Sequence, residues 1–349
     1  MKIIDLRSDT VTLPTQEMLR AIYDSDLGDD VYGEDPATNR LEEMAAERTG
    51  KEAALMVVSG TMGNLVSILT HCRRGEEVIL GNKSHTFIYE AGGMSALGGI
   101  HPHTVVNQPD GTMLLEDIQL AIRSDNIHFP RTRLICLENT HNYCGGTVLP
   151  VQYMEETAAL AQKNSLQVHL DGARIFNAAV ALGVDVKELT RYVDSVSFCL
   201  SKGLSAPVGS VICGSSNFIE EARRNRKMLG GGMRQCGIIA AAGIIALEQM
   251  VERLNEDHAN ARRLAEGIAG IPYLSIDLDK VQTNIVYFNL KSEKITTGTL
   301  VRQLANDGIK ISSSGTTRLR AVTHYGISTK DIDITLKALQ KYMKEIYKQ

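Results

Sequence analysis

Residues 194–214 read "DSVSFCLSKGLSAPVGSVICG": two short apolar runs, each typical of a buried strand, flank a single lysine, Lys202. Small neighbours, among them Gly203 and Ser205, leave room beside this lysine for a flat and bulky group. An unpaired ammonium at the end of a buried strand costs free energy. Lys202 is therefore either a lysine that reaches solvent or a desolvated amine that reacts with carbonyl groups.

Similar β-rich runs alternate with amphipathic helical patterns along most of the chain. We expect strands within 52–58, 76–81, 133–138, 166–171, 194–200 and 209–214. Helical patterns cover 37–50, 154–165, 216–229 and a long run, 238–270. Because parallel strands need crossover helices, this alternation predicts an α/β fold with a mainly parallel sheet and helices on both faces. Ligands of such sheets bind beyond the carboxyl ends of the strands.

The length and composition predict a globular protein with a sizeable core. The chain has 349 residues, of which 43% are hydrophobic and 22% are charged. We expect a large domain over 1–250 and a small C-terminal α+β domain over 251–349, with the boundary within the long helical run. No internal repeat or low-complexity tail is present.

Charge and cysteine usage exclude several classes of partner. The formal net charge of −4 gives no basic surface for a phosphate backbone, so nucleic acid is not an expected partner. No run of eighteen apolar residues occurs and the N-terminus has no apolar signal region, so we expect no membrane association. Six scattered cysteines without C-x-x-C spacing are typical of buried thiols in a reducing compartment, which predicts a cytoplasmic protein.

Two further strand ends carry polar groups. In "MVVSGTMGNLVSIL" (56–69), a buried run gives way to Ser59, Gly60 and Thr61 at the start of a helix, where backbone N–H groups can hold a phosphate. A simple helix cap is the alternative. In "LQVHLDGARIFNAA" (166–179), the run ends at Asp171, with Arg174 one turn further on. A helix cap or an Asp171–Arg174 pair is the alternative to a functional carboxylate.

A phosphate-binding turn, an acid that can pair with a ring nitrogen and an imine-forming lysine, in this order, together describe a pyridoxal phosphate site. The sequence also resembles the low-specificity threonine aldolases, of the aspartate-aminotransferase-like (fold type I) group of pyridoxal phosphate enzymes. The resemblance covers essentially the full chain through the motifs "IDLRSDTVT" (4–12), "GDDVYGEDP" (28–36), "SGTMGN" (59–64), "IHFPRT" (127–132), "ENTHN" (138–142), "HLDGARIFNA" (169–178), "SFCLSKGL" (197–204), "KMLGGGMRQ" (227–235) and "RAVTH" (320–324).

The resemblance implies a large domain with a mainly parallel seven-stranded sheet and a role for each motif. Lys202 is expected to form the internal aldimine of pyridoxal 5'-phosphate, and Asp171 to keep the ring nitrogen protonated. The remaining cofactor contacts are implied for Ser59, Gly60, Thr61, His85, Arg174 and Arg234, the last from a neighbouring subunit.

By the same resemblance, the substrate is a 3-hydroxy amino acid. Ser8, Arg174 and Arg320 are expected to hold its carboxylate, since a guanidinium binds a carboxylate bidentately. The expected reaction is retro-aldol cleavage of L-threonine or L-allo-threonine to glycine and acetaldehyde through a quinonoid intermediate. Segment 1–15 thereby contributes to the active site. Further substrate contacts are implied for Tyr32, Tyr89, His128 and Lys227, with Tyr32 from another subunit.

The cleavage needs a general base near the β-hydroxyl. The resemblance points to His85 and His128, and the residues leave open which of them, or a water that they hold, takes the proton. A structural role is the alternative for each histidine. His101 and His103 suggest a metal, but no carboxylate or cysteine follows at ligand spacing, so we expect no catalytic metal.

Two other interpretations stay open. Another lyase or an aminotransferase would use the same fold and cofactor, because the pocket selects the bond that breaks. A non-catalytic protein on this scaffold would leave charges at the strand ends without a partner. The family implies a homotetramer, a dimer of dimers whose active sites are shared between subunits.

Overall fold

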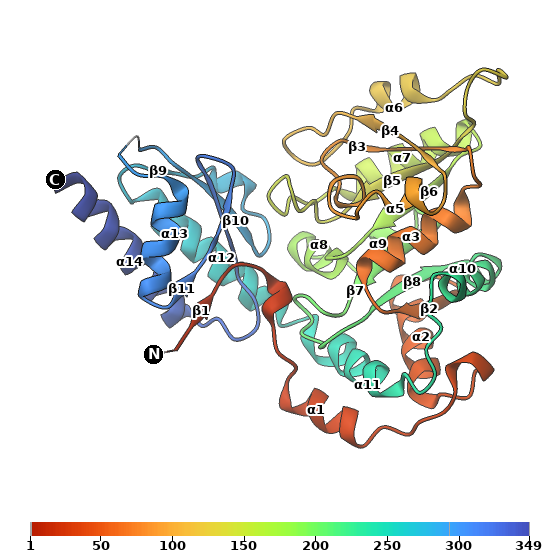
Figure 1. Cartoon of the computed structure of the whole chain (residues 1–349), viewed down its shortest axis with the longest axis horizontal. Coiled ribbons are helices and arrows are strands. Elements are labelled where there is room, and N and C mark those ends of the chain that lie inside the picture. The colour runs from red at the N-terminus through yellow and green to blue at the C-terminus, as the bar shows by residue number, and fades with distance from the viewer. Residues whose placement is uncertain (1, 293, 349) are drawn as a thin grey trace.

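A seven-stranded sheet forms the centre of the structure, a computed structural model that describes residues 2–292 and 294–348 (Figure 1). The strand order is β2 (Ala53–Val57), β8 (Ser210–Gly214), β7 (Ser195–Cys199), β6 (Gln167–Asp171), β5 (Thr132–Glu138), β3 (Glu77–Gly81) and β4 (His101–Val105). Only β8 runs antiparallel to its neighbours. The predicted α/β fold with a mainly parallel sheet is confirmed.

One strand of this sheet was not expected from the sequence. Strand β4 lies at the edge of the sheet and pairs only with β3. Its residues include His101, Pro102 and His103, and most of them are exposed or half-buried. An edge strand tolerates proline and polar side chains, so β4 lacks the apolar pattern that identified the buried strands.

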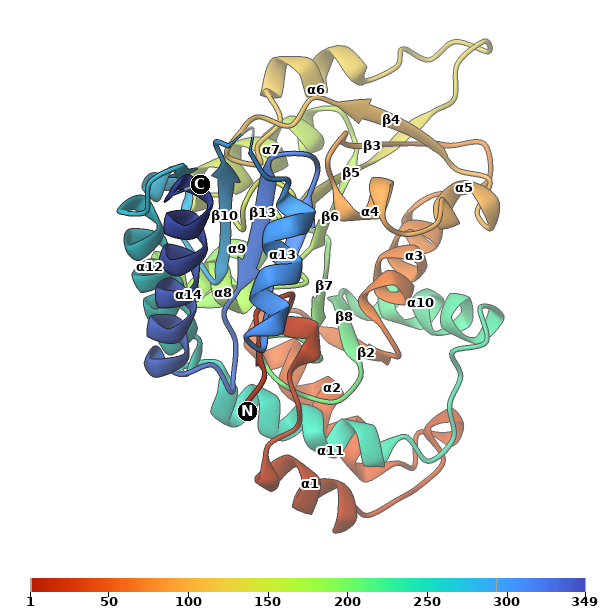
Figure 2. The ribbon, with the colours of Figure 1, turned by 60° about the vertical axis from the view of Figure 1, so that its left-hand side comes forward.

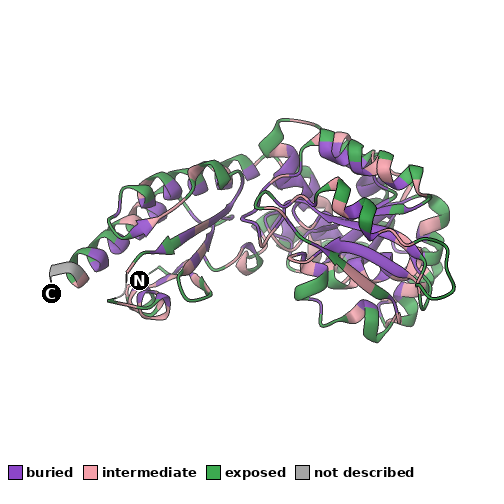
Figure 3. Cartoon of the chain, turned by 90° about the horizontal axis from the view of Figure 1, so that it is seen from above, coloured by how far each residue is buried: buried purple, intermediate pink, exposed green. Residues whose placement is uncertain are grey.

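Helices cover both faces of the sheet, and the strands bury side chains on each face. On β2, Leu55 and Val57 pack under α3 (Gly60–His71) and α10 (Ser216–Met228). The alternate residues Ala54 and Met56 belong to the main core. That core also contains α2 (Pro36–Thr49), α7 (Val151–Lys163) and α8 (Ile175–Leu182). Burial on both faces explains why these strands read as continuous apolar runs, and Figure 3 shows them as buried ribbons.

Shorter elements connect the sheet strands and their helices. The segments before β2 and between the strands contain α1 (Gln16–Tyr23), η1 (Asp9–Val11), η2 (Asp30–Tyr32), α4 (His85–Ile88), α5 (Gly93–Ala96), α6 (Leu115–Ala121) and α9 (Val186–Thr190). The long helical run predicted over 238–270 is α11 (Gly237–Ile245), the π-helical turn η3 (Ala246–Met250) and α12 (Leu254–Ala269). No helix in the described ranges is long and apolar enough to span a bilayer.

The C-terminal part has its own sheet and core. Strands β12 (Ser312–Ser314), β13 (Arg318–Val322), β10 (Ile285–Leu290) and β9 (Leu274–Ser275) form an antiparallel sheet. The other elements here are η4 (Leu278–Lys280), α13 (Thr297–Asn306), β11 (Ile309–Lys310) and α14 (Thr329–Lys348). Figure 2 shows α12, α13 and α14 around β10 and β13.

The N-terminal strand crosses to this second unit. Strand β1 (Ile4–Asp5) pairs in parallel with β11, and Ile4 and Leu6 lie in the C-terminal hydrophobic core. The two separate cores support a division near residue 250, within the helical run. We propose a large domain over 1–250 and a small domain over 251–349, in which strand β1 of the large domain pairs with β11 of the small domain.

The direction of the strands places several polar residues at one edge. Strands β2, β3, β5, β6 and β7 run in the same direction. The residues at or just after their carboxyl ends therefore meet there, namely Ser59, His85, Glu138, Asp171 and Lys202.

We predict that Phe198→Ala destabilises the large domain by about 3–5 kcal/mol, the usual cost of emptying a buried aromatic site. Phe198 lies on β7 at 1% exposure, and its ring meets that of Phe176 edge-on, with 5.2 Å between centroids. Urea denaturation followed by circular dichroism measures the change. The control is Leu120→Ala on α6, where the side chain is 83% exposed and little change is expected. Equal midpoints for the two variants would contradict the packing described for β7.

Candidate active site

A cavity of about 360 Å³ lies where the large unit, the N-terminal segment and the small sheet meet. It contains residues that follow strands of the large sheet, His85, Arg174 and Lys202, and residues of the small sheet such as Arg320. Its other lining residues are Ser8, Thr10, Tyr89, Asn142, Tyr287, Ser312, Ser313 and Ser314.

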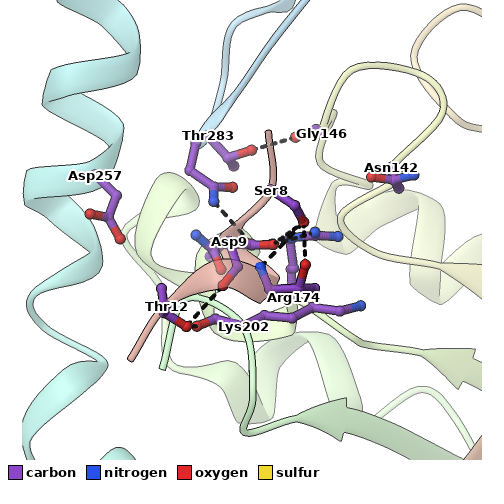
Figure 4. A network of polar contacts seen from close by, with 12 residues as sticks. Ser8, Asp9, Thr12, Asn142, Gly146, Arg174, Lys202, Asp257 and Thr283 are labelled. Carbon is purple, nitrogen blue, oxygen red and sulfur yellow. Dashed lines mark hydrogen bonds and ion pairs between the residues drawn. The ribbon is translucent and has the colours of Figure 1, made fainter. Parts of the chain in front are cut away.

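Lys202 lies in the tight loop after β7, with its amine free. Its carbonyl oxygen accepts hydrogen bonds from Thr12 Oγ1 at 3.0 Å and from the backbone N–H of Ser205 at 2.9 Å. Its ammonium has no hydrogen-bond or ion-pair partner within the described ranges 2–292 and 294–348. Figure 4 shows the extended side chain. The backbone of this lysine is therefore fixed while its amine is available to a ligand.

Asp171 ends β6 beside a cluster of polar side chains. Asn64, on α3, donates to Asp171 Oδ2 at 2.9 Å and to Glu90 Oε1 at 2.8 Å. Glu90 Oε1 in turn lies 2.9 Å from Nδ1 of His85. Ligand atoms of His85, Glu90 and Asp171 all lie within 4.8 Å of one another. Three groups with this spacing could hold a cation, but the Asn64 amide already donates to both carboxylates.

His85 connects this cluster to the cavity. Burial lowers the pKa of His85, but the hydrogen bond that His85 donates to Glu90 and the charges of Asp171, Glu90 and Glu138 outweigh burial, so the pKa is raised. The backbone N–H of His85 donates to Glu138 Oε2 at 2.7 Å, which fixes the start of α4. The ring of Tyr89 lies 5.4 Å from that of His85 between centroids. Glu138, Glu90 and Tyr89 thus fix His85, which lines the cavity.

Arg174 pairs with Asp9 rather than with Asp171. Its Nε and Nη2 donate to the two oxygens of Asp9 at 2.6 and 2.7 Å, and both residues are buried (Figure 4). Asn284 of the small domain donates to the same carboxylate at 3.1 Å. Burial raises the pKa of Asp9, but Arg174 outweighs burial and holds that pKa well below its usual range. Asp9 therefore ties the N-terminal segment to both domains and orients the guanidinium.

Arg320, on β13, presents a second guanidinium to the cavity. Its Nη1 donates to the carbonyl of Arg7 at 3.0 Å and its Nη2 to Asn142 Oδ1 at 2.9 Å. Its Nε is buried and makes no hydrogen bond to the described part of the chain. Burial lowers the pKa of Arg320. A buried donor without a partner costs free energy, which favours an anionic ligand at this position.

The turn at Ser59, Gly60 and Thr61 begins α3. Ser59 Oγ accepts from the N–H of Met62 at 3.2 Å, so the serine is also a helix cap. A Cβ on Gly60 would lie 2.8 Å from Cys199 Sγ, so only glycine fits against the end of β7. The turn therefore combines a helix cap with the free backbone N–H groups that can hold a phosphate.

Eight of the predicted site residues do not line the cavity: Ser59, Gly60, Thr61 and Asp171, which lie at the strand ends described above, and Tyr32, His128, Lys227 and Arg234. Tyr32 is 75% exposed, Arg234 donates to Asp29 at 2.9 Å, and Lys227 is exposed near the end of α10. His128 is exposed in the loop before β5, which is the amino edge of the sheet, opposite to Asp171 and Lys202. The cavity of one chain thus brings together only part of the predicted set, namely Ser8, His85, Tyr89, Arg174, Lys202 and Arg320.

The arrangement fits pyridoxal 5'-phosphate. A free amine, a carboxylate beyond a strand end and a helix N-terminus lie at one edge, and the hydroxyl of Ser210 at that edge is buried without a partner in the described structure. The residues that would hold the group are Lys202, Asp171, His85 and the turn 59–61. Two arginines of the cavity remain for a carboxylate.

Sequence reasoning missed several residues that hold the site together. Asp9, Asn64 and Asn142 lie inside the quoted motifs "IDLRSDTVT", "SGTMGN" and "ENTHN", but received no role. Glu90 follows His85 by five residues, within "GNKSHTFIYE". Tyr287 of β10 carries no motif. Each of these three motifs contains several polar residues, so composition alone did not single out Asp9, Asn64 or Asn142.

The geometry of the site and the sequence comparisons indicate the same group of proteins. The beta-eliminating lyase family matches residues 5–291. A probable low-specificity L-threonine aldolase 2 of Arabidopsis thaliana is 50% identical over 98% of this chain and 97% of its own length.

Solved structures show the same fold. A threonine aldolase of Leishmania major superposes with a TM-score of 0.84 at 19% identity, and covers 97% of this chain and 99% of its own. A structure of SPT that carries PLP has a TM-score of 0.78 at 19% identity, over 99% of this chain and 88% of its own. Together with the sequence match over nearly the full length, this establishes that the chain belongs to the threonine aldolases of the beta-eliminating lyase family.

Proposed function

We propose that the protein cleaves L-threonine or L-allo-threonine to glycine and acetaldehyde with pyridoxal 5'-phosphate. The observation that carries this proposal is the free amine of Lys202 in a cavity that also contains two arginines and His85. The similarity to threonine aldolases over 98% of the chain supports the choice of reaction.

When bound, pyridoxal 5'-phosphate supplies an aldehyde that captures amines and a cationic ring that withdraws electrons from the substrate Cα. Lys202 would hold the aldehyde through its amine, and Asp171 would pair with the ring nitrogen and keep it protonated. The turn 59–61 would bind the phosphate with backbone N–H groups at the start of α3.

The cavity residues select the bond that breaks. Arg174 and Arg320 would hold the substrate carboxylate, with Ser8 beside them, and this fixed orientation would select the Cα–Cβ bond for cleavage. His85 takes the proton of the β-hydroxyl, the Cα–Cβ bond breaks, and acetaldehyde leaves. A proton returned to Cα gives glycine. His85 must be neutral to accept the proton. Because its pKa is raised, the loss of activity on acidification begins at a higher pH than it would with an ordinary histidine.

The sequence and structure support a reducing, cytoplasmic location. All six cysteines are free and buried. Burial raises the pKa of Cys136 and Cys213, so these thiols are unreactive packing groups.

We predict that the protein with pyridoxal 5'-phosphate releases acetaldehyde and glycine in equal amounts from L-threonine. Lys202→Ala should lower kcat below about one thousandth of the wild-type value, because the covalent nucleophile is lost. A coupled alcohol dehydrogenase assay measures acetaldehyde. Lys163→Ala, at the exposed end of α7, is the matched control and should keep full activity. Ammonia and an oxo acid in place of acetaldehyde would identify a different lyase.

We predict that Asp9→Asn raises KM for threonine by about tenfold, because Arg174 loses the bidentate partner that orients it. The variant should also lose about 3–5 kcal/mol of stability, as expected when one partner of a buried ion pair is removed. Asp5→Asn is the control, since its pair with Arg7 is partly exposed, with the Arg7 side chain 49% and the Asp5 side chain 19% exposed. Steady-state kinetics measure KM for threonine in both variants. An unchanged KM in Asp9→Asn would refute the role of Asp9 in orienting Arg174.

We propose that the protein is a homotetramer, a dimer of dimers, in which one copy completes the cavity of another. Tyr32 and Arg234 support this proposal, because both side chains are exposed. The Arg234–Asp29 ion pair also joins the segment that contains Arg234 to the segment that contains Tyr32. Arg234 would reach the phosphate of the neighbouring copy, and Tyr32 and Lys227 would contact its substrate. His128 would reach the pocket in the same way, from an exposed loop.

Co-expression of two inactive variants tests this sharing. Lys202→Ala and Arg234→Ala each damage one contribution, so a mixed dimer contains one site with both changes and one intact site. Random pairing should restore about a quarter of wild-type activity in the mixture, by two-fold symmetry. The sites are not shared if the mixture shows only the average of the two separate variants.

A further inference from the structure

A line of polar side chains runs between α3 and the sheet, behind the proposed cofactor site. His71 Nε2 lies 2.7 Å from Ser195 Oγ, and His169 Nδ1 lies 2.8 Å from the same oxygen. His169 Nε2 lies 3.3 Å from Asn64 Oδ1, and Asn64 donates to Asp171 and Glu90. All members except His71 are buried.

The orientation of the Asn64 amide follows from its neighbours. Two carboxylates, those of Asp171 and Glu90, face one end of the amide, and a carbonyl oxygen there would be repelled. The hydroxyl of Ser197 donates to the other end at 2.7 Å. The amide nitrogen therefore faces the carboxylates, and the oxygen accepts from Ser197 and from His169.

Both histidines of the line are neutral, which fixes the direction of every hydrogen bond. Burial lowers the pKa of His169 to about 4, and burial together with His169 lowers the pKa of His71 to about 3. A neutral imidazole carries one N–H. His169 uses its Nε2–H toward Asn64, so its Nδ1 accepts the Ser195 hydroxyl, and the Ser195 oxygen accepts from His71 Nε2–H. Every donor in the line points toward Asp171 and Glu90.

We propose that Asn64 and Glu90 are positioning residues for the proposed reaction. Asn64, oriented by the line of hydrogen bonds from His71 to His169, holds Asp171 and Glu90 as neighbouring anions. Glu90 in turn fixes the ring of His85. The proposal rests on the proposed use of pyridoxal 5'-phosphate. It explains why a carboxylate that pairs with a cationic ring tolerates a second carboxylate so close to it, since a charged acceptor gains most from a fixed donor.

The groups that face these carboxylates come from several elements. Burial and the charge of Asp171 raise the pKa of Glu90, while His85 and Asn64 oppose that rise. The ring of His85 in turn depends on Glu90 for its anionic partner. The titratable groups around the pair are His85 of α4, His169 of β6, and Cys136 and Glu138 of β5.

Loss of Asn64 should weaken cofactor binding independently of catalysis. In Asn64→Leu, Asp171 loses the donor to Oδ2 and retains the N–H of Ala173 on Oδ1. We expect the dissociation constant of pyridoxal 5'-phosphate, titrated into the apoprotein by absorbance, to rise at least about tenfold, as for loss of one hydrogen bond to a charged group. Ser195→Ala, which breaks the line without touching the site, should change it in the same direction by a smaller factor.

The matched control is Asn260→Leu in the small domain. Asn260 is also buried, and its amide donates to the carbonyl of Ile327 at 3.1 Å. This variant should lose stability and keep wild-type cofactor affinity. Unchanged affinity in folded Asn64→Leu would overturn the role of Asn64, and unchanged affinity in Ser195→Ala would overturn the role of the line. Wild-type protein that does not bind pyridoxal 5'-phosphate would refute the proposed function instead.

Glu90→Gln tests the second half of the proposal through a pH profile. Glu90 raises the pKa of His85, so removal of its charge lowers that pKa. Since neutral His85 is the form that accepts a proton, the acid limb of kcat/KM should move to lower pH. Glu42→Gln is the control, because Glu42 is also a buried carboxyl with a pKa raised by burial, on α2 and away from the cavity. An acid limb that stays in place in Glu90→Gln, as in the control, would contradict the role of Glu90.

Discussion

The parallel direction of five strands is the constraint on which the site depends. Strands β2, β3, β5, β6 and β7 all end at one edge of the sheet, and a polar residue lies at or within a few residues of each end. The strands themselves are buried on both faces, and the polar groups of the site lie at this edge. The common direction of the strands thereby brings segments that are more than a hundred residues apart in the chain, such as those of Ser59 and Lys202, to the same edge.

The second domain completes the site through a buried ion pair. Asp9 binds Arg174 of the large domain and Asn284 of the small domain, while Arg320 of the small sheet binds the carbonyl of Arg7. The N-terminal segment therefore lies between the domains and orients both guanidinium groups. A fixed pair of guanidiniums selects a carboxylate in one orientation, and that orientation decides which bond of Cα is weakened.

Much of this arrangement could be predicted from the sequence, for identifiable physical reasons. Buried strands are recognisable in the sequence as apolar runs. A lysine or an aspartate at the end of such a run indicates the edge of the sheet where the site lies. The edge strand β4 has no such pattern, since its face is half open and its residues include Pro102. Asp9 and Asn64 act through partners that are distant in sequence, so no local pattern shows what they bind. The exposed position of His128, opposite to Lys202, depends on the direction of β5 and could not be read from "IHFPRT" alone.

The central claim is that the amine of Lys202 captures the aldehyde of pyridoxal 5'-phosphate. Borohydride reduction of the loaded protein, followed by proteolysis and mass spectrometry, identifies the lysine that carries the cofactor. The account predicts a single modified peptide that contains Lys202. Label on any other lysine, or no stable label at all, would contradict it.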